Sequence, residues 1–212
     1  MTTQESMKDQ WLRTRDRLVA KKLLRGADAS LSVRCPSGSS MWFGTAEERA
    51  PVLVDWRDAA RNGPASTHAI VHAGRADVGA VAWGGGPFGA CLADFGDVLP
   101  QVFDEQARHI GPMGRPAWSD KDLAAAFDIA GNALLWRGQP MCFGTTCTRL
   151  ALNAELFEKC AKAYVLAAAA GGRVKELPWL VRRIANGRLV KDERRAAQAF
   201  GRGELPVESS GY

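Results

Sequence analysis

The chain has 212 residues, of which 46% are hydrophobic and 24% charged, and its formal net charge is +5. This length suits one domain with an appended segment, and the composition is that of an ordinary globular protein. No apolar run approaches the roughly 20 residues that span a bilayer, and the first residues lack the pattern of a secretory signal. We therefore expect a cytoplasmic protein without a membrane partner. The five cysteines form no C-x-x-C pair, which favours free thiols.

The excess positive charge lies in two stretches near the ends of the chain, 8–25 and 181–195. Acidic residues interleave with the cations in both stretches, a pattern typical of solvated helix faces. Nucleic-acid binding therefore ranks last among the functions considered.

The first third of the chain predicts one helix and a hairpin. Apolar residues recur at helical spacing over 7–24, which predicts a helix that ends at Gly26. Two alternating runs, 31–34 and 40–43, flank a Pro-Ser-Gly-Ser turn and predict a β-hairpin. The apolar run 52–56 is a further short element.

The middle of the chain predicts a helix over 65–74 and a strand over 78–83. Ser119 stands three residues before Asp122, which is close to a capping box. The apolar spacing that follows predicts a helix over 119–135.

The last third predicts a short strand over 141–143 and a long helix that Asn153 caps and that ends at Gly171 and Gly172. A further helix is predicted to start at Pro178, to break at Asn186 and Gly187, and to resume to about Phe200, with 203–212 loose.

The order of these elements predicts two units. Strands and helices alternate irregularly, which favours an α/β or α+β domain with helices on both faces of a sheet. We expect that domain to span 1–174, followed by a helical C-terminal arm over 175–212.

Three blocks of the sequence, in order, resemble the class II aldolase/adducin family. They are DASLSVRCPSG (28–38), PASTHAIVHAGRADVGAVAWGG (64–85) and ALLWRGQPMCFGTTCTRLALNAELFEKCAKAYVLA (133–167). The resemblance covers roughly residues 8–172. It implies an α/β, three-layer domain with a central, mostly antiparallel sheet flanked by helices. It also implies a homo-oligomer, commonly a tetramer.

The positions that match the family's functional residues have changed. In the family, three histidines hold a divalent metal, usually zinc, and a glutamate at a helix start is catalytic. The matching positions here are Trp83, Gly85 and Gly138 for the histidines and Pro64 for the glutamate. Glycine carries no side chain and an indole nitrogen only donates hydrogen bonds, so we expect neither a bound metal nor another cofactor. The metal-assisted aldol cleavage of the family is not expected here.

Two histidines are the candidate catalytic residues. His68 and His72 stand four residues apart on one face of a predicted helix, and imidazole can transfer protons near neutral pH. The alternative is a pair of partly buried or interface histidines without a chemical role.

The candidate substrate-binding residues lie in the blocks that carry the resemblance. Hydroxyls and backbone N–H groups at a helix start favour anions, arginine pairs with them, and glycine allows a close approach of ligand to backbone. The candidates are Ser30, Ser32, Arg34, Ser66, Thr67, Trp83, Gly84 and Gly85. The alternatives are ordinary turn and cap chemistry for the hydroxyls, and an indole that fills the former metal cavity.

Two functions remain open at this point. One is a metal-independent enzyme, derived from a lyase, or a binder that acts on a small anionic carbonyl or phosphorylated metabolite. The alternative is a non-catalytic, oligomerising module, as in the adducin head.

Overall fold

The computed structural model describes residues 3–58, 63–128 and 131–208. Its centre is a six-stranded sheet in the order β3-β2-β1-β4-β6-β5, and every neighbouring pair of strands is antiparallel. The expectation of a mostly antiparallel sheet is confirmed. The strands are β1 (Ser30–Arg34), β2 (Ser40–Thr45), β3 (Val52–Asp55), β4 (Ala80–Trp83), β5 (Ala133–Trp136) and β6 (Gln139–Gly144).

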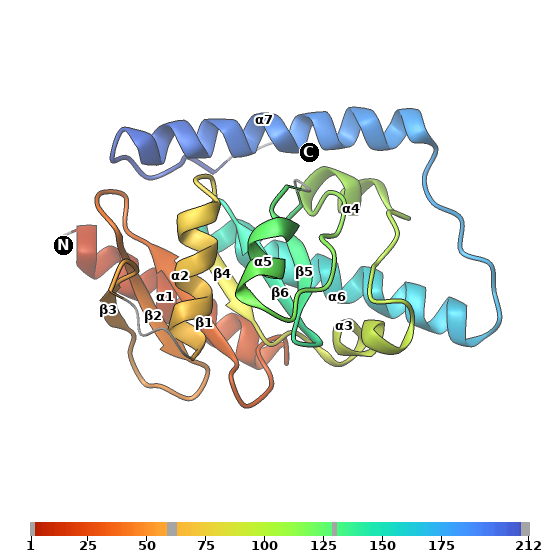
Figure 1. Cartoon of the computed structure of the whole chain (residues 1–212), viewed down its shortest axis with the longest axis horizontal. Helices are drawn as coiled ribbons and strands as arrows, with labels where there is room; N and C mark the ends of the chain where they lie inside the picture. Colours follow the sequence, from red (N-terminus) through yellow and green to blue (C-terminus); the bar gives the residue numbers. More distant parts are fainter. Residues whose placement is uncertain (1–2, 59–62, 129–130, 209–212) are drawn as a thin grey trace.

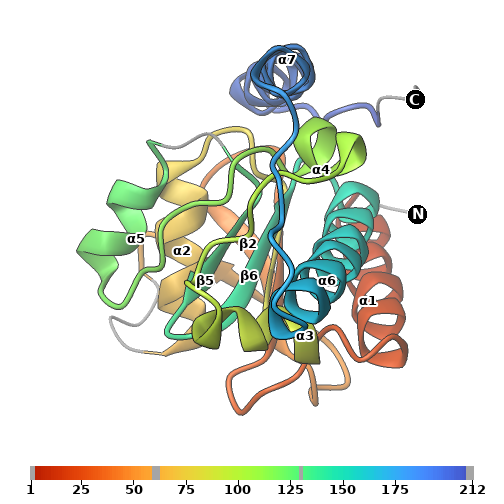
Figure 2. The ribbon, with the colours of Figure 1, turned by 90° about the vertical axis from the view of Figure 1, so that its right-hand side faces the viewer.

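Helices cover both faces of this sheet. Figure 2 shows α2 and α5 on one face and α1 and α6 on the other, which completes three layers. The helices are α1 (Thr3–Ala20), α2 (Pro64–Gly74), α3 (Pro87–Ala90), α4 (Asp104–His109), α5 (Asp120–Ala126), α6 (Cys147–Ala169) and α7 (Trp179–Gly201), with a 3₁₀ turn, η1 (Cys91–Asp94). None of the described helices is long and apolar enough to cross a membrane.

The two faces of β4 belong to two hydrophobic cores, because successive side chains of a strand point to opposite sides. Ala80 and Ala82 join the core beneath α1 and α6, together with Trp11. Val81 and Trp83 join the core beneath α2 and α5. A strand that is buried on both faces is expected to be a continuous apolar run in the sequence, and β4, with the sequence AVAW, is such a run.

The helix α7 runs along one end of the layers (Figure 1). That residues 175–212 form an arm separate from the domain stays a prediction. The second half of α7 is anchored: Leu189, Ala196 and Phe200 are buried, and Asp192 Oδ2 lies 2.6 Å from Arg108 Nη2 on α4. The predicted break at Asn186 and Gly187 is wrong, because α7 passes through both residues without interruption.

The prediction of one helix over 119–135 is half wrong. The capping box of Ser119 and Asp122 is present, but α5 ends at Ala126, and Ala133–Trp136 form strand β5. Residues 129–130 of that range lie outside the described part of the chain. A short apolar run fits a buried strand as well as a helix, and its pairing with β6 decided between them here.

Asn153 is not the cap of α6. The helix begins at Cys147, and the side chain of Thr146 accepts a hydrogen bond from the backbone N–H of Arg149. Asn153 is buried within the helix and donates from Nδ2 to the carbonyl of Phe143 at 2.8 Å. The first helix also ends earlier than predicted, at Ala20.

Candidate functional site

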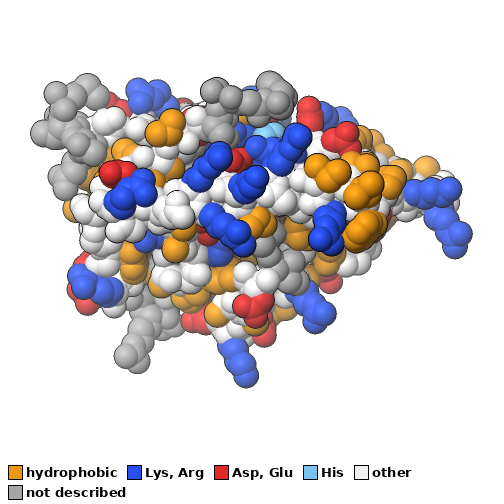
Figure 3. Space-filling model, turned by 90° about the horizontal axis from the view of Figure 1, so that it is seen from above, with side chains coloured by type: hydrophobic (Ala, Val, Ile, Leu, Met, Phe, Trp, Pro, Cys, Tyr) orange, Lys and Arg blue, Asp and Glu red, His pale blue; other side chains and the backbone are white. Residues whose placement is uncertain are grey.

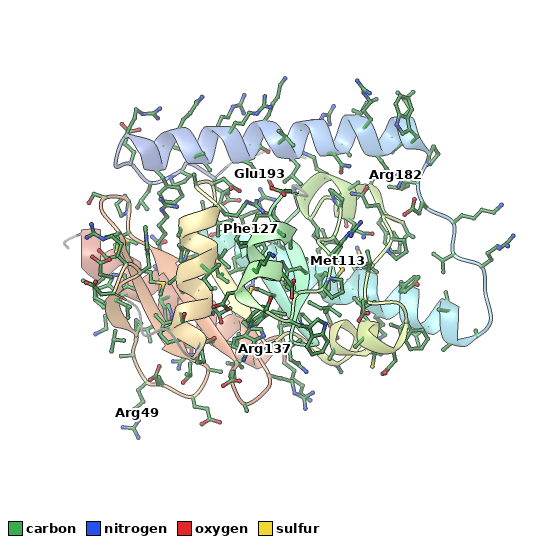
Figure 4. The ribbon with its side chains drawn as sticks, viewed as in Figure 1. Arg49, Met113, Phe127, Arg137, Arg182 and Glu193 are labelled. Atoms are coloured by element: carbon green, nitrogen blue, oxygen red, sulfur yellow. The ribbon has the colours of Figure 1, made fainter. Side chains whose placement is uncertain are left out.

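A cavity of about 160 Å³ lies where α2 begins and β4 ends. The residues that line it come from five separate segments: Asp28, Gly63, Pro64, Ser66, Thr67, Trp83, Asp120 and Arg137. Figure 4 shows Arg137 at the end of the sheet farther from α7. The cavity therefore lies at the same end of the layers as the turn between β5 and β6.

The first turn of α2 forms one wall of this cavity. Gly63 is the N-cap and offers no side-chain cap, Pro64 occupies the first turn, and no acidic residue stands there. The free backbone N–H groups of such a turn carry a partial positive charge and attract anions. Ser66 and Thr67 add hydroxyl groups at the same place.

Arg137 brings a full positive charge to the cavity. It forms with Gly138 the two-residue turn between β5 and β6, and both have positive φ, 50° and 75°. Two-residue hairpin turns of this kind favour the sequence Asn-Gly. A residue other than glycine that has a positive φ, as Arg137 does, carries local backbone strain. The guanidinium carbon lies 4.9 Å from the centre of the Trp136 ring, so stacking helps to orient it.

Two carboxylates, from Asp28 and Asp120, complete the polar lining. They can accept hydrogen bonds from ligand hydroxyl groups, whereas Arg137 and the start of α2 favour an anionic group. The cavity thus suits a small molecule that carries both an anion and hydroxyl groups.

The metal that the family resemblance implies does not fit these residues. Trp83 and Pro64 offer no metal-donor atom, and no group of three or more His, Cys, Asp or Glu side chains is placed to hold an ion in the described part of the chain. Position 85 has no room for any side chain, because a Cβ there would lie 2.5 Å from Pro140 Cβ.

Gly84 and Gly85 are accounted for by packing. Their φ values are 138° and 75°, and a Cβ on Gly84 would lie 2.6 Å from the carbonyl oxygen of Arg25. Neither glycine lines the cavity, so a direct contact between them and a ligand stays a prediction. Trp83 does line the cavity, and its buried indole N–H has no hydrogen-bond partner among the described residues.

Ser30, Ser32, His68 and His72 form one buried chain of hydrogen bonds beneath α2. Ser30 Oγ lies 3.0 Å from His68 Nε2, and Ser32 Oγ lies 2.8 Å from both His68 Nδ1 and His72 Nε2. The Ser30 hydroxyl donates to the carbonyl of Asp28 at 2.9 Å, so it accepts from His68 Nε2, and Ser32 then donates to His68 Nδ1. The chain ends on the backbone of a cavity residue.

The two histidines are neutral at physiological pH. Burial, with the nearby His72, lowers the pKa of His68 to about 3, and burial, with the nearby Arg34, lowers the pKa of His72 to about 3. Their exposed fractions are 0% and 1%, and neither lines the cavity. Direct proton transfer to a ligand by either residue has no support in this geometry.

Arg34 lies apart from the cavity. Its guanidinium carbon is 5.0 Å from the Trp56 ring centre and 4.8 Å from that of Phe200. It donates to the carbonyl of His72 at 3.3 Å, and burial lowers its pKa. Among the predicted binding residues, the structure therefore brings together Ser66, Thr67 and Trp83 and separates Arg34 from them.

The sequence analysis missed Asp28, Asp120 and Arg137. Asp28 opens the first block of the resemblance, and Asp120 follows the cap residue Ser119. The signal for Arg137 was present, because an x-Gly pair between two apolar runs is typical of a two-residue hairpin turn.

Three solved structures share this architecture. L-fuculose 1-phosphate aldolase matches with a TM-score of 0.75 and 19% identity over 90% of this chain and 98% of that chain. L-fuculose 1-phosphate aldolase from Glaciozyma antarctica PI12 matches with a TM-score of 0.71 and 15% identity over 96% of this chain and 92% of that chain. An aldolase II superfamily protein from Pseudomonas syringae matches with a TM-score of 0.70 and 13% identity over 98% of each chain.

The chain has the class II aldolase fold. No protein-family model and no curated protein matches the sequence. The expected aldolase-like architecture is thus confirmed by the structures, at an identity that shows the fold alone.

Proposed function

We propose that the chain binds, without a metal ion, a small anionic carbonyl or phosphorylated metabolite in the cavity at the start of α2. One observation carries this proposal: the uncapped first turn of α2 and Arg137 line the same small cavity. Both favour an oxyanion, and their combination is characteristic of phosphate and carboxylate sites.

The size of the cavity limits the ligand. A water molecule takes about 30 Å³ in the liquid, so the cavity has room for roughly five waters or a metabolite of a few carbon atoms. The carboxylates of Asp28 and Asp120 would accept hydrogen bonds from its hydroxyl groups. If the protein turns the ligand over, one of these two acids would move the proton, since they are the acidic side chains of the lining.

In this proposal, His68 and His72 are positioning residues. Their chain of hydrogen bonds ends on the carbonyl of Asp28 and so fixes the backbone that carries the Asp28 carboxylate. Ser30 and Ser32 have the same role, and Trp83 forms an apolar wall.

The test is a thermal-shift and calorimetric panel of two- and three-carbon hydroxyaldehyde and hydroxyacid phosphates, each beside its unphosphorylated counterpart. We expect phosphorylated compounds to stabilise the wild type, because a ligand selective for the native state raises the melting temperature. Arg137→Gln should remove most of that stabilisation. Arg115→Gln, which changes an exposed arginine outside the cavity, is the matched control.

Metal independence is tested on the same material. We expect the ligand response to persist after dialysis against EDTA, and elemental analysis to find no stoichiometric divalent metal. A response that EDTA removes, or one that Arg137→Gln leaves intact, would contradict the proposal.

A second function, an interaction module, has one observation in its favour. Trp179, Leu180 and Ile184, at the start of α7, are 63%, 58% and 55% exposed. Figure 3 shows hydrophobic side chains gathered at that end of the molecule. An exposed group of this kind favours contact with another protein, and a homo-oligomer, as the aldolase resemblance implies, would use it. Light scattering on Trp179→Ser beside the wild type tests this candidate through the loss of assembly.

A further inference from the structure

A second cavity, of about 420 Å³, lies at the opposite end of the sheet. It is bounded by α1, by the start of α6 directly after β6, and by the C-terminal segment 202–208. A neighbouring cavity of about 100 Å³ shares Gln10, Thr146, Cys147 and Pro206 with it, so the two adjoin beneath that segment.

The lining of the two adjoining cavities has more cationic than anionic side chains. Arg13 and Arg17 project from α1, and the smaller cavity adds Arg34. Arg17 shares its charge with Glu155, whose Oε1 lies 2.6 Å from its Nε. Glu208 is the one carboxylate among the lining residues that the structure describes.

The carboxylate of Glu208 is held as a bound anion would be. It accepts a hydrogen bond from the Thr146 hydroxyl, and its Oε1 lies 2.9 Å from Arg149 Nη2. Arg149 is oriented in turn by His109, whose Nδ1 accepts from Nη1 at 2.9 Å. Burial, with the nearby Arg149, lowers the pKa of His109 to about 4, so the imidazole is a neutral acceptor.

The segment that carries Glu208 is also held by a hydrogen bond from the Glu204 N–H to the carbonyl of Ala199 at 2.9 Å and by the packing of Leu205 and Pro206 on the smaller cavity. Residues 204–208 form neither helix nor strand, and Val207, next to Glu208, is 94% exposed. A segment of this kind opens at a low free-energy cost compared with the core. An external anion can therefore compete with Glu208 for the same partners.

We infer that this cavity is a binding site for a small phosphate-bearing molecule, and that Glu208 occupies the position of the phosphate group until the ligand displaces it. A phosphate dianion carries more negative charge and more acceptor oxygens than one carboxylate, so it gains more from the arginines of the lining and the Thr146 hydroxyl. The volume beyond the anion position accommodates the rest of the ligand. The site binds without covalent chemistry, because burial raises the pKa of the Cys147 thiol to about 12.

This inference does not depend on the proposed function, since the two cavities share no lining residue. The probe is inorganic phosphate, titrated calorimetrically into the full chain at constant ionic strength. Glu208→Gln removes the competing charge and should tighten phosphate binding about tenfold, the effect of one charge-assisted hydrogen bond. Arg13→Ala should weaken binding, and Lys8→Ala, on the same helix but outside the lining, should leave it unchanged.

Hydrogen exchange supplies the second readout. Phosphate should speed the exchange of the backbone amides of 204–208 in the wild type, because the ligand displaces the segment. Equal phosphate affinity in the wild type, Glu208→Gln and Arg13→Ala would overturn the inference. Binding that only Arg137→Gln removes would assign the phosphate to the first cavity and would also overturn it.

Discussion

The hydroxyl oxygen of Ser32 lies between two imidazole rings, 2.8 Å from Nδ1 of His68 and 2.8 Å from Nε2 of His72. A hydroxyl has one proton to donate, so Ser32 donates to one ring and accepts from the other. Because the Ser30 hydroxyl donates to Asp28 and accepts from His68 Nε2, Ser32 donates to His68 Nδ1 and accepts from His72 Nε2. The His68 ring must then be neutral, because its Nδ1 accepts and carries no proton. Protonation of His68 at Nδ1 would take away the acceptor of the Ser32 hydroxyl proton at a buried site.

The first prediction concerns acid stability. Because the pKa of His68 in the folded protein is lowered to about 3 from its ordinary 6.5, its stabilising contribution is complete above pH 6.5 and is lost as pH falls toward 3. His68→Gln keeps a donor and an acceptor but cannot be protonated. The free energy of unfolding of this variant should fall less between pH 6.5 and pH 4, by up to about 1.4 kcal/mol per pH unit.

Urea unfolding at pH 7, 6, 5 and 4 measures this slope. His109→Gln is the comparison, because the pKa of the half-buried His109 is lowered less, to about 4. Parallel curves for the wild type and His68→Gln would contradict the neutral, buried state of His68.

The second prediction has the opposite sign and concerns Glu193 on α7. Its carboxylate and that of Asp77 both contact the buried guanidinium of Arg75. Arg75 Nη2 lies 3.4 Å from Glu193 Oε1 and 2.7 Å from Asp77 Oδ2. Burial, together with Asp77 and Asp192, raises the pKa of Glu193 to about 7, against the lowering effects of Arg75 and Asn132. Its contribution to stability is therefore complete below about pH 4.5 and is lost as pH rises through 7.

Glu193→Gln should consequently gain stability relative to the wild type as pH rises from 5 to 8, by about 1–3 kcal/mol. Thermal and urea unfolding at the two pH values measure the difference. A difference between the two proteins that stays constant from pH 5 to pH 8 would show that Glu193 does not titrate in this range.

The sequence predicted the layers of the fold better than their boundaries. Alternation predicted the hairpin of 31–34 and 40–43, and the structure pairs Val33 with Trp42. The strand Ala133–Trp136 was predicted as helix, because each of its residues is buried and no alternation distinguishes the two structures. Asn153 looked like a cap, but its partner is the carbonyl of Phe143 on another element, which no local pattern reveals.

The sequence predicted only those cavity residues that a local pattern indicates. Ser66 and Thr67 follow from the helix start, and Trp83 follows from the end of a strand. Asp28 and Asp120 reach the cavity only through the packing of separate segments. The histidines share a helix face as expected, but that face lies on β1, where Ser30 and Ser32 are buried.

The third prediction concerns the cap beside the first cavity. The Ser119 side chain accepts from the N–H of Asp122, and Asp120 of the cavity stands between them. Ser119→Ala should lower the free energy of unfolding by about 1 kcal/mol, the usual contribution of such a cap, and should weaken ligand binding by loosening Asp120. Ser119→Asp, which also caps, should restore both quantities. If Ser119→Asp also lowers both the free energy of unfolding and the ligand affinity, the Ser119 hydroxyl does not act through the cap hydrogen bond.

The fourth prediction separates the two costs of a side chain at Gly84. A Cβ there would meet the carbonyl oxygen of Arg25 at 2.6 Å, and the φ of 138° is itself unfavourable for other residues. Gly38 has a φ of 79° and no atom within 4 Å of the place where a Cβ would lie, so it carries the conformational cost without the collision. Gly38→Ala should therefore cost about 1 kcal/mol, whereas Gly84→Ala should cost about 2–4 kcal/mol.

Urea unfolding of the two variants beside the wild type gives both costs. The backbone of Arg25 cannot retreat freely, because Leu24 beside it forms a β-bridge with Gly85. An equal cost at positions 38 and 84 would show that this loop moves away from a new side chain. Gly84 could then be replaced by a larger residue, and close packing would not explain why glycine stands beside Trp83.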